Sequence, residues 1–591
     1  MDAGLRQRLY YEACIPAGLL VLGGCHYGLP PYGVDSAALT TAVSGLLMAA
    51  VVIVQLGMRL GFCSTVVFPG TQPKMFRPQA DSGSIWGGVL VPLVMLALNI
   101  RDRAAEDTTQ SLGLGAYRAW VASIAMAWAF TLLVLGTQVR RARSLPLWLL
   151  GCASVAGLGI TGAAQTDTGV CAGVLLAFVA AGMQYAVTRA VVCGLPRSFT
   201  LGEAAAIAQG VVLAGGDLAF RALGPAGGYT GAELQMLTLV LEAAGLGLLL
   251  LVYALCRVFP RDGQTVAADA VWLCGLCGAA AVATLGLTAL VSRRNPVAWA
   301  LAVVFGTAGS VAVLGYWLVL LLIAALFYAH FADAHFADAH TANARKTHTS
   351  NAQAKLALHI KRKAYHILAV LLFAPGFVAA PRVLHVGFAA ALCVFVCAEC
   401  VRVLDVCSLG AWMGGFMRQF TDARDAGYVV TAHFYLLGGC AVPVWLGGSA
   451  GAAPLAGVLS LGVADTAASL VGVRFGATRW PGSPKTVEGT AAFVVSLFIV
   501  CEVVCLAVPR GAGVLGNLAM SVVLGLLEAL TEQNDNLIIP LTMYAAATML
   551  AGASGALVHW GSVLLIAAML AFSPLHFFLT KQSCIMKQGV C

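Results

Sequence analysis

The chain has 591 residues, of which 60% are hydrophobic and 10% are charged, and its formal net charge is +8. Ordinary soluble domains carry about 25% charged residues, so this composition excludes a water-soluble protein. Its apolar residues fall into many runs of about 18 to 25 residues, long enough to cross a hydrocarbon core of about 30 Å. We therefore expect an all-α, polytopic integral membrane protein. Nucleic-acid binding is not indicated, because the basic residues lie at the ends of the apolar runs, where membrane topology explains them.

The N-terminal half consists mostly of predicted membrane spans. The first resembles a signal peptide, but Pro16 interrupts it and no cleavage site of small residues follows, so we interpret it as a retained span. The tenth is long enough to tilt or break. The predicted spans lie near 13–27, 37–58, 84–100, 119–139, 145–163, 169–187, 201–220, 236–256, 270–290 and 299–328.

A polar stretch then separates the two halves of the chain. It contains two copies of His-Phe-Ala-Asp-Ala, starting at His330 and His335, followed by His340. A period of five matches neither a helix face nor a strand, so a duplication in a loop explains the repeat better than a metal site does. We expect three parts: an N-terminal multi-span region (1–329), a polar linker (330–358) and a C-terminal catalytic membrane domain (359–591).

The C-terminal half adds eight predicted spans, which brings the expected total to about 16 to 18. Counted from Lys355, twelve basic residues fall on one side of the membrane and two on the other. Basic residues favour the cytoplasmic side, so we expect the polar loops 402–431, 474–488 and 528–536 to face the cytosol and to converge on one site. The spans lie near 364–380, 383–401, 432–447, 452–473, 489–509, 513–531, 537–554 and 559–580.

An acidic residue lies inside the fourth of these spans. Asp465, Ser469, Gly472 and Gly476 recur at spacings of four, three and four, which places them on one helix face. A charge within a membrane span is costly, so it indicates a functional residue. The structural alternative is a buried aspartate bonded to a neighbouring hydroxyl such as Thr466.

A candidate phosphate-binding loop follows this span. Gly482 allows a close approach of the backbone, Lys485 supplies a positive charge, and the amides at the start of the next helix favour an anion. Pro484 precedes the lysine and the spacing differs from that of a Walker loop. Composition and spacing alone support only a phosphate-binding loop on a membrane protein. The candidate residues in 460–490 are Ser469, Gly472, Arg479, Trp480, Gly482, Lys485, Thr486, Glu488, Gly489 and Thr490.

A second polar cluster begins near Glu528 and separates two apolar spans. Asp535 and the amides Gln533, Asn534 and Asn536 offer oxygen ligands for magnesium, held directly or through water. The same residues are also those that cap the start of a helix, so a simple turn is the alternative.

Three smaller groups of polar residues have plain structural explanations. The basic run 361–363 before His366 is a cytoplasmic flank, Glu399 and Arg402 form an i, i+3 pair, and 422–427 is a solvated loop. In the first half, Thr200 and Glu203 fit a capping box at the start of a helix.

Together, these motifs resemble those of dolichol kinases within the wider polyprenol kinase family. D-T-x-A-S, R-W-P-G and K-T-x-E-G-T follow one another from 465 to 490, and E-x-x-T-x-Q-x-D-N-L-x-x-P begins at 528. R-K-x-x-H, E-x-x-R, D-x-R-D-x-G and T-H also occur, and the segment around Glu203 is similar to a feature of the family. Ala426 stands where the family suggests a serine. The similarity is densest over 359–545.

The resemblance implies transfer of the γ-phosphoryl group of CTP to dolichol, giving dolichyl phosphate for protein glycosylation at the endoplasmic reticulum membrane. It implies that the candidate residues of 460–490 contact the nucleotide, with Lys485 at the phosphates. It also implies that Asp465 and Asp535 hold Mg²⁺ or another divalent cation. Amides near Gly482, Thr486 and Gly489 would approach the phosphates, and Asn534 and Asn536 would orient the metal's ligands or waters. The acceptor hydroxyl must lose a proton, for which the candidate bases are Asp425, His366 and His433.

Other functions remain open from the sequence. One alternative is another CTP-dependent lipid kinase, acting on phytol or diacylglycerol, or a phosphatidate cytidylyltransferase. The other is a transporter of lipids or anions in which Asp465, Glu242 and Lys485 line a pathway. The choice of CTP over ATP rests on the resemblance alone, and no protein partner is indicated.

Overall fold

The structure is a computed structural model that describes most of the chain from residue 170 to residue 551. The described ranges are 76–77, 86–87, 90–91, 93–94, 97–98, 170–223, 266–341, 349–405, 409–417, 427–447, 451–480, 483–507, 512–531 and 533–551. Within these ranges the regular elements are helices, and Arg479 and Thr486 form an isolated antiparallel bridge. The expected all-α class is confirmed.

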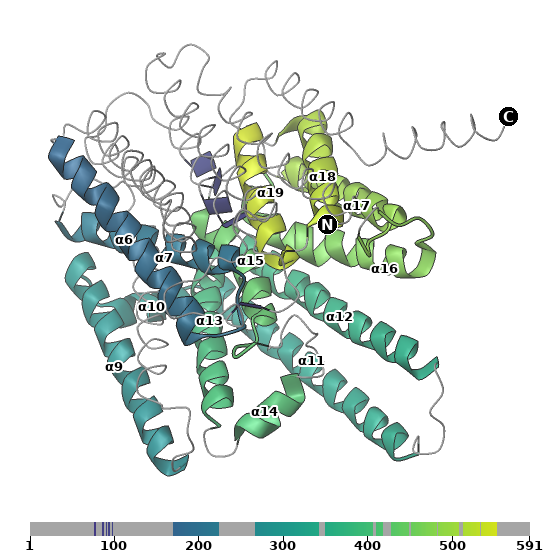
Figure 1. Cartoon of the computed structure of the whole chain (residues 1–591), viewed down its shortest axis with the longest axis horizontal. Helices are drawn as coiled ribbons and strands as arrows, with labels where there is room; N and C mark the ends of the chain where they lie inside the picture. Colours follow the sequence, from purple (N-terminus) through teal and green to yellow (C-terminus); the bar gives the residue numbers. More distant parts are fainter. Residues whose placement is uncertain are drawn as a thin grey trace, which may run out of the picture.

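The helices pack as a bundle in which the C-terminal elements α15 to α19 lie together (Figure 1). The helices are α6 (Val170–Gly194), α7 (Leu201–Leu223), α9 (Val266–Ser292), α10 (Pro296–Phe305), α11 (Ala308–Thr341), α12 (Thr349–Ala379), α13 (Pro381–Leu404), α14 (Leu409–Met417), α15 (Ala432–Leu446), η5 (Ala453–Leu455), η6 (Val458–Ala464), α16 (Asp465–Phe475), α17 (Val487–Ala507), α18 (Gly513–Leu530) and α19 (Asp535–Ala551).

Seven helical segments in the described ranges are long and apolar enough to cross a membrane. The chain is therefore a multi-pass membrane protein. Every predicted span from 169 onward that falls on described residues coincides with helix. The spans 13–27, 37–58, 119–139, 145–163, 236–256 and 559–580 lie outside the described residues, so the total of 16 to 18 stays a prediction.

One feature confirms an expectation from the hydrophobic pattern and two differ from it. The long span 299–328, expected to tilt or break, is broken at Gly306 and Thr307, where the Thr307 hydroxyl accepts a hydrogen bond from Ser310 N at 3.1 Å and caps α11. The repeat at 330–341, which we interpreted as a loop, continues α11, because its alanines are strong helix formers. A short helix, α14, also forms inside the predicted loop 402–431.

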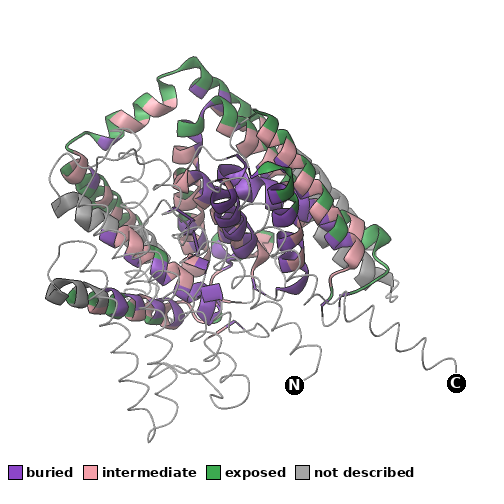
Figure 2. Cartoon of the chain, turned by 90° about the horizontal axis from the view of Figure 1, so that it is seen from above, coloured by how far each residue is buried: buried purple, intermediate pink, exposed green. Residues whose placement is uncertain are grey.

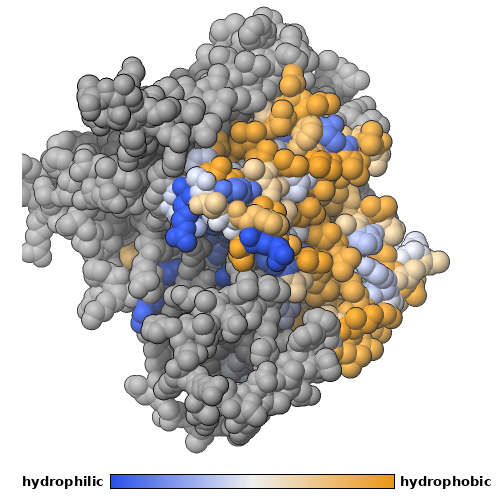
Figure 3. All heavy atoms as spheres, turned by 90° about the vertical axis from the view of Figure 1, so that its right-hand side faces the viewer, coloured by the Kyte–Doolittle hydropathy of each residue, from blue (hydrophilic) through white to orange (hydrophobic). Residues whose placement is uncertain are grey.

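The core lies between the C-terminal helices. Most residues of α18 and α19 are buried, and the buried helices gather at the centre of the view in Figure 2. By contrast, α9, α11 and α17 expose large apolar side chains, including Leu318 and Leu506. Figure 3 shows the side of the molecule on the right of Figure 1, where hydrophobic atoms form a broad area beside a smaller hydrophilic group. A lipid environment explains this exposure of apolar surface.

Three of the described helices contain a proline in their interior, and each of these prolines leaves one backbone carbonyl without its usual hydrogen bond within the helix. Neighbouring elements contact these carbonyls. Pro375 has no N–H to bond the carbonyl of Leu371, which instead accepts a hydrogen bond from the Tyr316 hydroxyl of α11 at 2.8 Å. The Trp317 indole donates to the next carbonyl, that of Leu372, also at 2.8 Å. In lipid, where no water can satisfy a free carbonyl, such partners hold α11 against α12.

At the other two prolines, the freed carbonyl packs against a glycine of a neighbouring segment, and no side chain among the described residues donates to it. Pro540 in α19 frees the carbonyl of Asn536, which packs against Gly439 of α15, where a Cβ atom would overlap this oxygen. Pro443 in α15 likewise frees the carbonyl of Gly439, which packs against Gly457. Both contacts join backbone to backbone, so only glycine fits.

This packing predicts different effects at two adjacent glycines. Gly439→Ala should destabilise the protein by about 1 to 3 kcal/mol, because the added methyl group overlaps the Asn536 carbonyl. Gly438→Ala is the matched control, since a Cβ at Gly438 meets no atom within 4 Å. The thermal unfolding midpoint in detergent measures both variants. Equal midpoints for the two variants would contradict the close packing of α15 on α19.

Candidate active site

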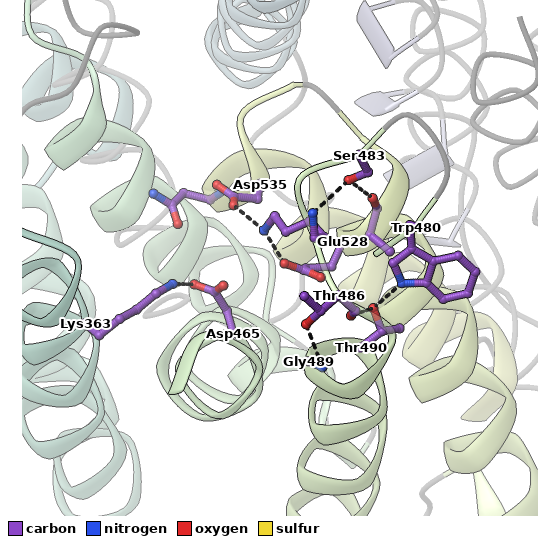
Figure 4. Close-up of polar contacts among 12 residues, drawn as sticks. Lys363, Asp465, Trp480, Ser483, Thr486, Gly489, Thr490, Glu528 and Asp535 are labelled. Carbon is purple, nitrogen blue, oxygen red and sulfur yellow. Dashed lines mark hydrogen bonds and ion pairs between the residues drawn. The ribbon is translucent and has the colours of Figure 1, made fainter. Parts of the chain in front are cut away.

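Segments that are distant in sequence meet where α12, α16, α17, α18 and α19 come together (Figure 4). Lys485, in the loop before α17, pairs with Glu528 near the end of α18, and its Nζ lies 3.9 Å from Asp535 Oδ2 at the start of α19. Lys363 of α12 pairs with Asp465 at the start of α16. The expected convergence of the 474–488 and 528–536 loops is therefore observed.

The loop before α17 is a short hairpin. The backbone N–H of Trp480 donates to the Lys485 carbonyl at 3.0 Å, and that of Val487 donates to the Thr478 carbonyl at 2.8 Å. The carboxylate of Glu488 accepts a hydrogen bond from Thr478 N at 3.0 Å. Glu488, which we expected to contact nucleotide, therefore closes the hairpin.

Trp480 anchors this hairpin to the membrane helices. Its ring is buried against Ala529 and Leu530 at the end of α18. The indole N–H donates to the Thr490 hydroxyl at 2.9 Å, which ties the hairpin to the first turn of α17. Ser483 adds a second tie, since its hydroxyl donates to the Ala529 carbonyl at 2.8 Å. These contacts fix where the backbone carries Lys485.

The glycines of the motif lie where α16 crosses α17. A Cβ atom at Gly489 would lie 2.9 Å from the Ala468 carbonyl, and one at Gly472 would lie 3.0 Å from the Thr486 hydroxyl. Thr486 also accepts a hydrogen bond from Gly489 N at 3.2 Å, which caps α17. These small residues permit close helix packing, whatever their contact with nucleotide. Ser469 is half-buried on α16, and Arg479 is exposed on the hairpin.

Lys485 is held between carboxylates. Burial alone would lower the pKa of this lysine, but the negative charges of Glu528, Asp535 and Asp465 raise it above its ordinary value. The ammonium group therefore stays charged throughout the neutral range. About a third of the side chain is exposed, so an anion can reach it.

Asp465 lies at the end of a π-helix. The segment η6 has π-helical hydrogen bonding, which is frequent at functional sites, and Asp465 follows it with 2% of its surface exposed. His366 Nδ1 lies 2.9 Å from the Leu461 carbonyl and 3.3 Å from Asp465 Oδ2. Thr466, the alternative partner for the aspartate, has a buried hydroxyl that makes no hydrogen bond within the described residues. The charge is therefore met by Lys363 and His366.

The second polar cluster has both structural and electrostatic contacts. Asn534 Oδ1 and Asp535 Oδ1 each accept a hydrogen bond from Asn536 N at 3.1 Å, as expected for residues that cap a helix start. The other carboxylate oxygen of Asp535 faces Lys485. The carboxylate thus caps α19 and contributes to the charge at the site.

The carboxylates present are compatible with magnesium bound together with a nucleotide. No group of three or more His, Cys, Asp or Glu side chains suited to a metal occurs among the described residues. Magnesium at nucleotide sites, however, is held by one or two carboxylates, by phosphates and by water. Asp465 Oδ1 is buried and makes no hydrogen bond in the described part of the chain, so it can serve as such a ligand.

The structure separates the expected proton acceptors. His366 contacts Asp465, whereas the ring of His433 packs 5.0 Å from that of Phe395 and 4.3 Å from that of Phe434. The Glu399 and Arg402 pair is present, at 2.6 Å, and holds the turn at 428–430. Asp425 and Gly482 lie outside the described residues.

Two charged residues of the site were not among the sequence candidates. From the sequence, Lys363 is part of a cytoplasmic flank and Glu528 is the first residue of a motif. Their spacing carries no signal for pairing, because Lys363 is 102 residues from Asp465 and Glu528 is 43 residues from Lys485. The one clue to Glu528 in the sequence is that it is an acidic residue within an apolar run.

Comparison with known proteins shows clear relatives. A protein-family model described as dolichol kinase matches residues 59–442. A dolichol kinase of Arabidopsis thaliana is 41% identical over 201 residues, which cover 32% of this chain and 35% of that protein. The human dolichol kinase is 32% identical over 364 residues (59% and 64% of the two chains), and the bovine one is 29% identical over 514 residues (80% and 86%).

The matches differ in extent. Those to the Arabidopsis and human proteins span less than two thirds of each relative's length. The family match ends at residue 442, before Asp465 and the hairpin, so it is independent of the motifs from 465 onward. No solved structure matches the chain.

The paired charges predict how the site tolerates substitution. Lys485→Met should reduce the amount of folded protein, because Glu528, which is 3% exposed, would keep a buried charge without its main partner, at a cost of about 3 kcal/mol. Lys485→Met combined with Glu528→Gln should restore the folded amount, since both charges are then absent. Size-exclusion chromatography in detergent measures the yield of each variant. If the single variant matched the wild type in yield and unfolding midpoint, the pair would not be stabilising.

Proposed function

This chain belongs to the dolichol kinase family, and we propose that it transfers the γ-phosphoryl group of CTP to the terminal hydroxyl of dolichol, giving dolichyl phosphate. The observation that carries this proposal is the charged cluster of Lys485, Glu528 and Asp535 beside the buried Asp465. Phosphoryl transfer depends mainly on positioning and charge neutralisation, which such a cluster provides. CTP as the donor follows from the resemblance of the 465–490 motifs to the family.

Lys485 is the residue that we assign to the phosphates. In the structure its ammonium group is bound by Glu528 and faces Asp535, and it remains partly exposed. A phosphate that approaches the lysine competes with these carboxylates for it. The hairpin contacts of Trp480 and Ser483 hold the backbone still during this exchange, so the lysine side chain alone has to move.

Asp465 and Asp535 are the residues that would hold Mg²⁺ or another divalent cation. The cation would neutralise charge that develops on the phosphates. Asp465 offers its free Oδ1 oxygen, while its Oδ2 oxygen is bound by Lys363 and lies near His366. Asn534 and Asn536 fix the loop that carries Asp535.

His366 is the favoured base among the three candidates. Its Nδ1 atom faces two acceptors, the Leu461 carbonyl and the Asp465 carboxylate, so Nδ1 carries the hydrogen. In the neutral ring, Nε2 then holds the lone pair that can accept the proton of the dolichol hydroxyl. An aspartate that orients a histidine through Nδ1 is a recurring arrangement for a general base.

The membrane setting agrees with a lipid substrate. The isoprenoid chain of dolichol requires only apolar surface, which lies beside hydrophilic groups on the side shown in Figure 3. The distribution of basic residues supports catalytic loops that face the cytosol, where nucleotide is available. We place the protein in the endoplasmic reticulum membrane, with 359–591 as its catalytic part and 1–329 as an N-terminal multi-span part.

Transfer of label from γ-labelled CTP to dolichol tests the proposed reaction. Membranes with the wild type should form labelled dolichyl phosphate and release CDP. Asp465→Asn, and Lys485→Met combined with Glu528→Gln, should lower the rate by about 10² to 10³, the usual effect of losing a positioned charge. Arg294→Gln, which changes an exposed cation between α9 and α10, is the control and should match the wild type.

Other products of this assay would change the conclusion. Label on diacylglycerol or phytol in place of dolichol would change the substrate and keep the site. Release of pyrophosphate would indicate a cytidylyltransferase. Use of ATP in preference to CTP would overturn the donor, and no consumption of nucleotide with any lipid would favour a transporter.

The assignment of the base gives a separate prediction. His366→Gln should lower kcat by about 10² to 10⁴, the range expected for loss of a general base. His433→Gln is the matched control and should leave kcat near that of the wild type, because the ring of His433 packs against Phe395 and Phe434, whereas His366 is the histidine that contacts Asp465. Steady-state kinetics with saturating CTP and dolichol measure both. A larger loss at His433 than at His366 would reverse the assignment.

A further inference from the structure

A buried ion pair in the N-terminal half lies next to residues that contact the loop carrying Asp535. Arg77 and Glu203 are 6% and 4% exposed, and the two terminal guanidinium nitrogens of Arg77, Nη1 and Nη2, contact the carboxylate at 2.9 and 2.8 Å. Such a two-point contact fixes the orientation of both side chains. Neither residue lies in the charged cluster around Lys485.

Glu203 also builds the start of α7. Its carboxylate accepts a hydrogen bond from Thr200 N at 3.0 Å, and the Thr200 hydroxyl accepts one from Glu203 N at 3.2 Å. The capping box predicted from the sequence is therefore present. Arg77 adds a backbone contact, since its N–H donates to the Phe199 carbonyl at 3.0 Å. The loop at 195–200 is thus held firmly in one conformation.

This loop packs on the C-terminal half. The Arg77 guanidinium donates to the Ser198 carbonyl at 2.8 Å and to the Thr431 hydroxyl at 3.2 Å. The Ser198 hydroxyl in turn accepts a hydrogen bond from Val429 N at 2.8 Å, and Tyr428 N donates to the Pro196 carbonyl. The contacts join the loop to the turn before α15.

One further contact reaches the candidate active site. The Thr200 hydroxyl donates to the Gln533 side-chain oxygen at 3.3 Å. Gln533 lies two residues before Asp535, whose carboxylate faces Lys485, and its backbone N–H donates to the Thr531 hydroxyl at 3.1 Å. Thr200 and Gln533 are both buried, so water does not compete for this hydrogen bond.

From these contacts we infer that Arg77, Glu203 and Thr200 are positioning residues that set the place of the 531–535 loop, so that the N-terminal half forms part of the catalytic unit. This inference rests on the proposed function for its effect on catalysis. A membrane anchor would require only apolar contacts between the halves. The structure shows instead buried polar contacts. Arg77 pairs with Glu203, Glu203 holds Thr200 at the start of α7, and Thr200 bonds Gln533 of the 531–535 loop.

Kinetics of three variants test the positioning role. Glu203→Gln keeps the side-chain shape but removes the charge, and Thr200→Val removes the hydroxyl that reaches Gln533. Both should lower kcat with CTP by about tenfold or more, as expected for a displaced catalytic group, and should leave the KM for dolichol unchanged. Thr200→Ser retains the hydroxyl and should restore kcat. Wild-type kcat in Glu203→Gln and Thr200→Val would overturn the positioning role.

A double-mutant cycle tests the contact without an activity assay. Thr200→Val and Gln533→Met are compared singly and together by thermal unfolding in detergent. If the contact exists, the double variant lowers the midpoint by less than the sum of the single shifts. Gln533→Met leaves the Arg77 pair intact, so it remains informative if Thr200→Val folds poorly.

The kinetics and the double-mutant cycle together distinguish failure of the proposed kinase function from failure of the contact between the two halves. Additive midpoint shifts would overturn the connection between the halves even if the wild type is a kinase. Coupled shifts in a protein that phosphorylates no lipid alcohol would uphold the connection and overturn the proposed function. Coupled shifts together with the selective fall in kcat would support both.

Discussion

A charge that leaves water inside a membrane protein needs a partner beside it, and this requirement shapes the whole site. Lys485 is bound by Glu528, Lys363 by Asp465, and Arg77 by Glu203. Each pair joins two helices or a helix and a loop that are distant in sequence. The cost of burying an unpaired charge is large enough to select these partners over others. The pairs therefore help to determine which helices lie together, as well as the electrostatics of the site.

Backbone carbonyls that are shielded from water also need a partner within the protein. Proline interrupts α12, α15 and α19, and each frees a carbonyl that lipid cannot satisfy. Tyr316 supplies a hydroxyl to one, and Gly439 and Gly457 let backbone approach the other two. The contact at Gly439 involves Asn536, in the first turn of α19, so the position of the helix start next to Asp535 depends on this packing. The interruptions in the helices thus contribute to the geometry of the site.

Hydropathy and motifs predicted much of this arrangement, and the limits of that prediction have a physical cause. Long apolar runs specify helices directly, because lipid permits few other structures, and the capping box at Thr200 depends only on residues three apart. Pairing across the bundle depends on three-dimensional packing. The sequence therefore explains Lys363 as an ordinary flanking charge and gives no signal at Arg77. The repeat at 330–341 was misjudged for another reason, since its five-residue period hid the helix propensity of its alanines.

The charge of the cluster constrains how a nucleotide can bind. The residues named here provide three carboxylates, Asp465, Glu528 and Asp535, against two lysines, Lys363 and Lys485. With His366 neutral, as its proposed role as a base requires, the carboxylates outnumber the cations before phosphates arrive. Phosphates would add several negative charges at short range, where a partly buried site screens the repulsion less than bulk water does. Lys485 alone cannot offset them, because its charge is shared with two carboxylates. Under the proposed function, a cation that enters with the nucleotide would remove this imbalance, and Asp465 Oδ1, which has no hydrogen bond in the described residues, would be available to it.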